Sequence, residues 1–132
     1  LFFYKENWRI NHWRAIESAY NSTPFFEYYR DDYEVVFMKK YNYLIDFNMD
    51  LLETTLRLLH ISKEIEKTSE YIPKEDNNPW DMREAFHPKH ESTTQITPYY
   101  QVFEHKFGFQ PNLSIIDLLF NMGPEAIFTL RK

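Results

Sequence analysis

The chain has 132 residues, no cysteine, and 15 Lys and Arg against 20 Asp and Glu, which gives a net charge of -5. The lack of cysteine excludes disulfides and thiolate metal sites, and the acidic balance argues against nucleic acid as the main partner, because that affinity needs cationic contacts. No apolar run approaches the ~18 residues of a membrane span, and no signal-peptide pattern is present, so we expect a cytoplasmic protein.

Helical periodicity dominates the first sixty residues. Asn7 or Asn11 is expected to cap a first helix, with Trp13, Ile16 and Tyr20 on its buried side. A second helix is predicted to start where Thr23 and Pro24 give a cap followed by proline, and to run through Tyr41 with a break at Asp31 and Asp32 as an option. The third is predicted from Tyr43 to His60, capped by Asn42, with Asn48 inside its apolar face.

The second half begins with less regular sequence. Residues 61–71 fit either a short edge strand or the frayed tail of a helix. Residues 73–98 read as a long polar loop, with one helical turn near Trp80 to Phe86. Thr97 and Pro98 repeat the cap-plus-proline pattern and predict a helix that Gly108 ends.

The run from Ser114 to Pro124 carries the strongest structural signals. Ser114 and Asp117 have the spacing of a capping box, and Gly123 with Pro124 should end the helix. That helix is apolar almost all round, so it should lie at the centre of the fold, and the tail after it should form one more turn or a strand. The prediction is a mainly α protein: a single compact helical domain over residues 1–132, or the helical portion of a larger α+β fold.

Two residues are candidate catalytic groups. His12, among apolar residues, is either a general base or a half-buried structural histidine. Asp117 is embedded in the apolar sequence IIDLLF, where an uncompensated carboxylate is costly. It is therefore either satisfied as part of the capping box or held toward a pocket together with Ser114 and Asn112.

The polar loop holds a candidate ligand-binding group. An exposed Trp80 with Arg83, His87 and Lys89 nearby suits a phosphate- or nucleotide-bearing ligand. A metal bound by the histidines of HPKH, with Asp81 or Glu91 as a further ligand, is the alternative, but the proline within that motif argues against a helix there. A solvated loop fits better, and we expect no metal site.

Several stretches resemble one known family. Asn7 to Tyr29, Tyr99 to Pro124, and the segment DMREAFHPK from Asp81 to Lys89 resemble the WbqC-like protein family. Members of that family carry an additional N-terminal part rich in strand-like and basic sequence. Because that part is missing here and the first residue is Leu rather than Met, we expect the chain to be a fragment.

The resemblance implies a function and a set of site residues. It implies a bacterial cytoplasmic protein that acts on a nucleotide-linked sugar in O-antigen polysaccharide biosynthesis, with no particular cofactor indicated. The alternative is a non-catalytic binding or assembly protein whose aromatic surface forms a homo-oligomer interface. The positions that match the family's polar signature are His12, Tyr20, Arg83, Lys89, Tyr100, Gln101, Asn112, Ser114, Asp117 and Asn121, and Trp80 joins them as a candidate ligand-binding residue.

Overall fold

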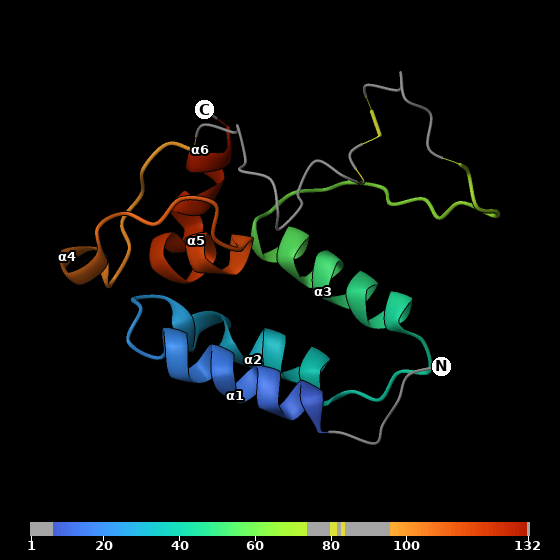
Figure 1. Ribbon diagram of the computed structural model, residues 1–132, viewed down its shortest axis with the longest axis horizontal. Helices are drawn as coiled ribbons and strands as arrows, with labels where there is room; N and C mark the ends of the chain where they lie inside the picture. Colours follow the sequence, from blue (N-terminus) through green and yellow to red (C-terminus); the bar gives the residue numbers. More distant parts are fainter. Residues whose placement is uncertain (1–6, 74–79, 82, 84–95, 132) are drawn as a thin grey trace.

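The computed structural model describes residues 7–73, 80, 81, 83 and 96–131, and all regular structure in that part of the chain is helical. The prediction of a mainly α fold is therefore confirmed. None of the helices within the described residues has the length and apolar character needed to cross a membrane. The elements, shown in Figure 1, are α1 (Trp8–Tyr20), α2 (Phe26–Met38), α3 (Leu44–Leu58), α4 (Glu104–Phe107), α5 (Ile115–Met122), the 3-10 turn η1 (Gly123–Glu125) and α6 (Ala126–Leu130).

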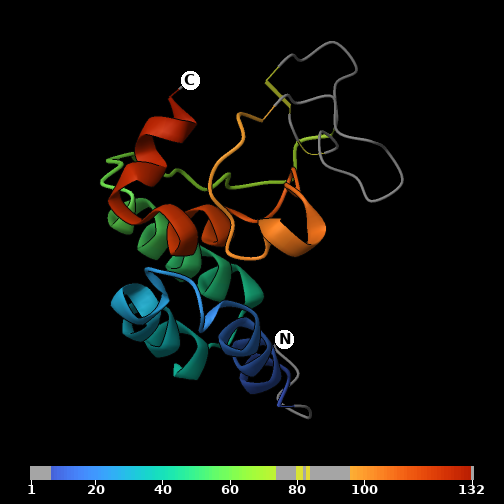
Figure 2. The same cartoon turned by 90° about the vertical axis from the view of Figure 1, so that its left-hand side faces the viewer.

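The first two helices form an antiparallel pair that packs through aromatic rings. α1 and α2 lie side by side in both views (Figures 1 and 2), joined by a short connection. The Trp13 ring of α1 lies 5.4 Å from Phe37 and 6.2 Å from Phe26 between centroids, and it is 2 % exposed. Ring pairs at these separations are favourable beyond the area they bury. The predicted buried side of the first helix is confirmed at Trp13.

Helix α5 lies at the centre of the core, as its sequence predicts. Leu119 and Phe120 are 0 % exposed. The Phe120 ring lies 5.2 Å from Tyr20, 5.1 Å from Phe26 and 5.6 Å from Tyr33, all in edge-to-face arrangements. A single side chain of α5 thus contacts both α1 and α2. The residues after α5 continue in η1 and α6, so the helical alternative for the tail is the right one.

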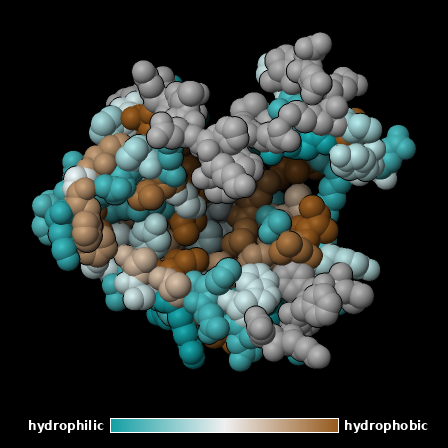
Figure 3. Space-filling view, in the orientation of Figure 1, coloured by the Kyte–Doolittle hydropathy of each residue, from teal (hydrophilic) through white to brown (hydrophobic). Residues whose placement is uncertain are grey.

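Helix α3 packs on α2 with a narrow apolar stripe. Phe47 and Thr55 are buried, and Leu51 between them is half-buried, at the four-residue spacing of a single helix face. Asn48 lies beside this stripe and is exposed, so its predicted place in the buried face is wrong. Three other apolar side chains of α3 are exposed: Leu44, Ile45 and Leu52. Apolar surface accordingly gathers over this helix in Figure 3.

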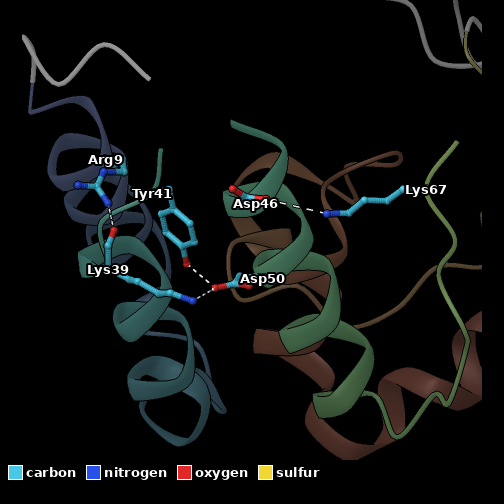
Figure 4. A network of polar contacts seen from close by, with 6 residues as sticks. All are labelled: Arg9, Lys39, Tyr41, Asp46, Asp50 and Lys67. Atoms are coloured by element: carbon cyan, nitrogen blue, oxygen red, sulfur yellow. Dashed lines mark hydrogen bonds and ion pairs between the residues drawn. The ribbon is translucent and has the colours of Figure 1, made fainter. Parts of the chain in front are cut away.

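A surface network holds the connection between α2 and α3 (Figure 4). Asp50 of α3 accepts hydrogen bonds from Lys39 Nζ at 2.6 Å and from the Tyr41 hydroxyl at 2.8 Å. The guanidinium of Arg9 in α1 donates to the carbonyl of Lys39. The pKa of Tyr41 is raised by burial and by the bond to Asp50, and that of Asp50 is lowered by its bonds to Lys39 and Tyr41. The network joins three successive helices.

The expected starts of α2, at Phe25 and Phe26, and of α3, at Tyr43, agree closely with the structure, but the expected caps are wrong. The Thr23 hydroxyl donates to the Tyr20 carbonyl at 2.7 Å, so it closes the end of α1 instead of capping α2. α2 begins at Phe26, runs without a break past Asp31 and Asp32, and ends at Met38, short of Tyr41. α3 begins after Tyr43, and no side chain caps it, Asn42 included. At both starts tertiary contacts outweigh the local capping signals.

The second half contains less helix than predicted. Residues 61–71 form neither a strand nor a helix, and Lys67 within them pairs with Asp46 of α3 at 3.9 Å (Figure 4). Residues 97–101 are extended, and the helix expected from Pro98 onward is reduced to α4, which Gly108 ends with φ 69° as predicted. Most of the predicted loop at 73–98, and all but three residues of the turn at 80–86, lie outside the described residues.

Gly123→Ala should destabilise the protein more than Gly108→Ala. Both glycines have positive φ, +56° and +69°, so both substitutions strain the backbone. A Cβ at Gly123 would also lie 2.5 Å from the Phe25 ring, whereas one at Gly108 meets nothing within 4 Å. We expect Gly123→Ala to lower the free energy of unfolding by about 1–3 kcal/mol more than Gly108→Ala in urea titrations. Equal losses would show that the ring moves aside freely.

Candidate functional site

A buried carboxylate organises the polar groups at one end of α5. Asp117 is 6 % exposed. Its Oδ2 accepts hydrogen bonds from the Tyr99 hydroxyl at 2.7 Å and from Gln101 Nε2 at 3.3 Å, and its charge contributes to the raised pKa of Tyr20 in α1. One phenol and one amide therefore compensate the buried charge, and they lie 18 and 16 residues from Asp117 in the sequence.

The capping box predicted for this helix is wrong. Ser114 does precede α5, but its side chain makes no cap hydrogen bond. The bond between the two residues runs through the backbone, from Asp117 N–H to the Ser114 carbonyl at 2.8 Å. Asp117 turns its carboxylate to Tyr99 and Gln101 instead, because charge-assisted bonds to neutral donors satisfy a buried carboxylate.

Two amides tie the extended segment to α5. Gln101 is buried and bonds to the backbone of Gln110 twice: Nε2 donates to the Gln110 carbonyl at 2.9 Å, and Oε1 accepts from its N–H at 2.8 Å. Asn121 accepts from the Val102 N–H at 3.0 Å and donates to the Asp117 carbonyl at 2.8 Å. Gln101 thus closes the loop that contains α4, and Asn121 fixes that loop on α5.

Sequence reasoning missed Tyr99 and chose its neighbour. In an extended chain, residues two apart point to the same side. Tyr99 and Gln101 both reach Asp117, while Tyr100 points away and is 53 % exposed. The helix expected there would have placed Tyr100 and Gln101 differently. Residues 97–103 have the sequence TPYYQVF, in which polar and apolar residues do not alternate, so no local signal separates Tyr99 from Tyr100.

Burial keeps the two tyrosines protonated. Desolvation is the largest cause that raises the pKa of Tyr20, to about 12, and the bond and charge of Asp117 raise it further. The pKa of Tyr99 is raised by the same causes. Both phenols therefore remain neutral across the physiological range, and Tyr99 remains a donor to the carboxylate.

Tyr20→Phe should reduce the loss of stability at alkaline pH. The pKa of Tyr20 is higher in the folded chain than in the unfolded chain, so the folded state binds more protons above pH 10 and its stability falls as pH rises from about 10 to 12. Chemical unfolding at several pH values should give a slope for the variant that is shallower by up to about 1.4 kcal/mol per pH unit. Tyr43→Phe, which removes an exposed phenol, is the control and should follow the parent chain.

Two neighbouring cavities lie around the start of α5. One, of about 150 Å³, is lined by Tyr20, Gln101, Asp117 and Asn121 with apolar side chains around them. The other, of about 380 Å³, is lined by the polar residues Thr97, Asn112, Ser114 and Thr129, together with Tyr99 and apolar residues. Leu113 lines both, and Tyr99 of the larger cavity bonds to Asp117 of the smaller. The six residues of the predicted polar signature brought together here are Tyr20, Gln101, Asn112, Ser114, Asp117 and Asn121.

The other predicted site residues lie elsewhere. His12 is exposed on α1 with its ring 5.3 Å from that of Trp8. Trp80 is 88 % exposed, and the Arg83 guanidinium is held by Asp81 and by the Ile72 carbonyl at 2.8 Å. Within the described residues, the cavities at α5 are lined by none of these side chains. The predicted Lys89, His87 and His90 fall outside the described residues.

No metal centre emerges from the described part of the chain. Among residues 7–73, 80, 81, 83 and 96–131, no three His, Asp or Glu side chains lie together in a way that could hold a metal ion. The chemistry that the α5 cavities offer is hydrogen bonding to hydroxyl and amide groups, from neutral donors around a single buried carboxylate.

Comparison with known proteins bears on the same stretches. No curated protein sequence and no solved structure matched the chain. The model of the WbqC-like protein family matches residues 2–98 and 83–129, which together cover almost the whole sequence, including α5 and the residues that surround Asp117. The chain therefore belongs to the WbqC-like protein family.

Proposed function

We propose that this protein acts in the cytoplasm on a nucleotide-linked sugar in the biosynthesis of bacterial surface polysaccharide. The sugar would occupy the larger cavity, where Asn112 and Ser114 provide hydrogen-bonding groups. The observation that carries the proposal is that six residues of the family's polar signature line two adjoining cavities at the start of α5. Membership of the WbqC-like family supports it.

The sizes of the two cavities fit two parts of one ligand, with the sugar in the larger cavity and a substituent in the smaller one. Sites for small molecules usually measure about 300–1,000 Å³. At about 380 Å³ the larger cavity is in that range, and at about 150 Å³ the smaller one takes no more than a substituent of the ligand. Amide and hydroxyl groups at the larger cavity suit sugar hydroxyls, which are themselves donors and acceptors. Asp117 would then accept a proton or a hydrogen bond from a group that enters the smaller cavity.

The test uses a substitution that preserves the backbone. Asn112 has φ 59°, a conformation that glycine adopts without strain, so Asn112→Gly removes the amide and should leave the fold intact. Calorimetric titration with uridine diphosphate glucose should show binding to the parent chain and roughly tenfold weaker binding to the variant. His60→Gly is the matched control, because His60 also has positive φ, at 55°, and lines neither cavity.

Separate titrations with uridine diphosphate and with glucose locate the recognised part of the ligand. Equal binding by Asn112→Gly and the parent chain would remove the sugar from this cavity. If uridine diphosphate glucose, guanosine diphosphate mannose and free sugars all leave the thermal transition unchanged, the proposal fails and the non-catalytic alternative stands.

A further inference from the structure

The smaller cavity at the start of α5, of about 150 Å³, carries one negative charge. Among the described residues that line it, Asp117 is the one charged side chain, and the other polar side chains are the Tyr20 phenol and the amides of Gln101, Gln110 and Asn121. No Lys, Arg or His in the described part of the chain forms an ion pair with Asp117. The charge is therefore met by neutral donors alone.

The carboxylate of Asp117 keeps an acceptor site for a donor that enters this cavity. The backbone N–H and carbonyl of Asp117 are both hydrogen-bonded within residues 114–121, so the residue lines the cavity with its side chain. A carboxylate has about four acceptor sites. The bonds from Tyr99 and Gln101 both end on Oδ2, which leaves Oδ1 with capacity even beside the Tyr20 phenol. Neither oxygen is among the described side-chain atoms that lack both accessible surface and a partner.

The surface network at Asp50 shows which cation a carboxylate of this kind takes in the same protein (Figure 4). Oδ2 of Asp50 accepts from the Tyr41 hydroxyl at 2.8 Å and from the Lys39 ammonium group at 2.6 Å. Oδ2 of Asp117 likewise accepts from a tyrosine hydroxyl, that of Tyr99 at 2.7 Å, but no described residue that lines its cavity carries an ammonium group. A buried carboxylate gains more from such a partner than an exposed one, because water and salt screen the attraction less.

The cavity has room and an entrance for an amine on a short carbon chain. A cavity of about 150 Å³ in another protein holds benzene. Three residues of the lining reach the surface, since Ala19 is exposed, Phe107 is 60 % exposed and Leu113 is 47 % exposed. The neighbouring Lys106 does not line the cavity, and its Nζ lies 5.0 Å from the centre of the Phe107 ring. A small amine can therefore enter and reach Asp117.

We infer that the smaller cavity binds a protonated primary amine. Its ammonium group would donate to Oδ1 of Asp117 and bring the missing positive charge, and such charge-assisted hydrogen bonds are the strong ones. A hydroxyl group can donate as well but carries no charge, and phosphate or carboxylate groups are repelled by Asp117. The inference deepens the proposed function, on which it rests for the remainder of the ligand: the substituent in the smaller cavity would be the amino group of an amino sugar.

Two small probes of the same shape test the amine alone. Propylammonium chloride and 1-propanol have matching frameworks, but only the amine is charged. In titrations of the 132-residue chain at neutral pH and constant ionic strength, the side-chain amide signals of Gln101 and Asn121 in nuclear magnetic resonance spectra should report binding, about tenfold or more tighter for the amine. Asp117→Asn should bind the two probes equally, because it loses the charge and keeps an acceptor. Asp50→Asn is the control and should keep the preference, since Asp50 lies outside this cavity.

A second variant keeps the test decisive if Asp117→Asn folds poorly. Ala19→Leu fills the cavity from an exposed position on α1 and should abolish binding of the amine. Ala15→Leu, exposed on the same helix and outside the cavity, should bind like the parent chain. Absence of binding by the parent chain, equal affinity for the two probes, or an unchanged preference in Asp117→Asn overturns the inference. Full binding by Ala19→Leu overturns the placement in this cavity.

Titrations with nucleotide sugars separate this inference from the proposed function. Uridine diphosphate glucosamine should bind the parent chain more tightly than uridine diphosphate glucose and should lose that advantage in Asp117→Asn. Binding of both nucleotide sugars with equal affinity, together with no preference for propylammonium, overturns the inference and leaves the proposed function standing. Preference for propylammonium without binding of any nucleotide sugar supports the amine site and overturns the proposed function.

Discussion

Phe120→Ala should cost about 3–5 kcal/mol in the free energy of unfolding, among the largest effects of any single substitution in this chain. Phe120 is fully buried, and its ring contacts Tyr20, Phe26 and Tyr33. Truncation removes the apolar contacts of the ring and leaves a cavity where α5 meets the α1–α2 pair. Urea unfolding followed by circular dichroism should show a midpoint moved strongly downward, or no cooperative transition.

Phe128→Ala is the matched control for this experiment. Phe128 lies on α6 and is 63 % exposed, so its truncation should change the free energy of unfolding by no more than about 0.5 kcal/mol. Phe120→Leu fills part of the cavity and should recover a substantial share of the lost stability. Similar losses for Phe120→Ala and Phe128→Ala would contradict the central place of α5 in the core.

The central helix was predictable because its signals are local and agree with one another. Gly123 after the apolar run sets its end, and side chains that are apolar on almost all sides have no stable place except the core. The structure places α5 as predicted, with Gly123 at φ 56°. The first helix was predictable for a similar reason, since the regular spacing of Trp13, Ile16 and Tyr20 has only one helical interpretation.

Some residues that line the two cavities were named from the sequence, but their geometry was not predictable. The family signature named Gln101, Asp117 and Asn121, and the structure brings them to one cavity. Their partners were not predictable, because the bonds from Tyr99 and Gln101 to Asp117 join positions 18 and 16 residues apart. The local pattern at Thr97 and Pro98 favoured a helix. The segment is not helical there, because the bonds of Tyr99 and Gln101 to the buried carboxylate outweigh the local preference.

Asp117→Ala should cost about 2–4 kcal/mol in the free energy of unfolding and should loosen the segment of residues 96–110. The buried carboxylate accepts from Tyr99 and Gln101, and its removal leaves a phenol and an amide without their acceptor in a site that water reaches poorly. Amide hydrogen exchange should therefore rise at Gln110 and Val102, whose N–H groups are held by the amides of this network. Chemical denaturation measures the loss in the free energy of unfolding, and amide hydrogen exchange shows which residues lose protection.

Asp50→Ala tests whether burial or hydrogen bonding causes the loss of stability expected for Asp117→Ala. Asp50 also accepts from a tyrosine hydroxyl, at 2.8 Å, and from Lys39 at 2.6 Å, but its side chain is 31 % exposed, so water replaces the lost partner and the cost should stay within about 1 kcal/mol. If both aspartates cost the same, burial is not what makes Asp117 important. A large loss confined to Asp117→Ala, with faster exchange at Gln110, would mean that the carboxylate holds the walls of both cavities together. Any ligand-binding role of Asp117 must then be measured in Asp117→Asn, which keeps an acceptor for Tyr99.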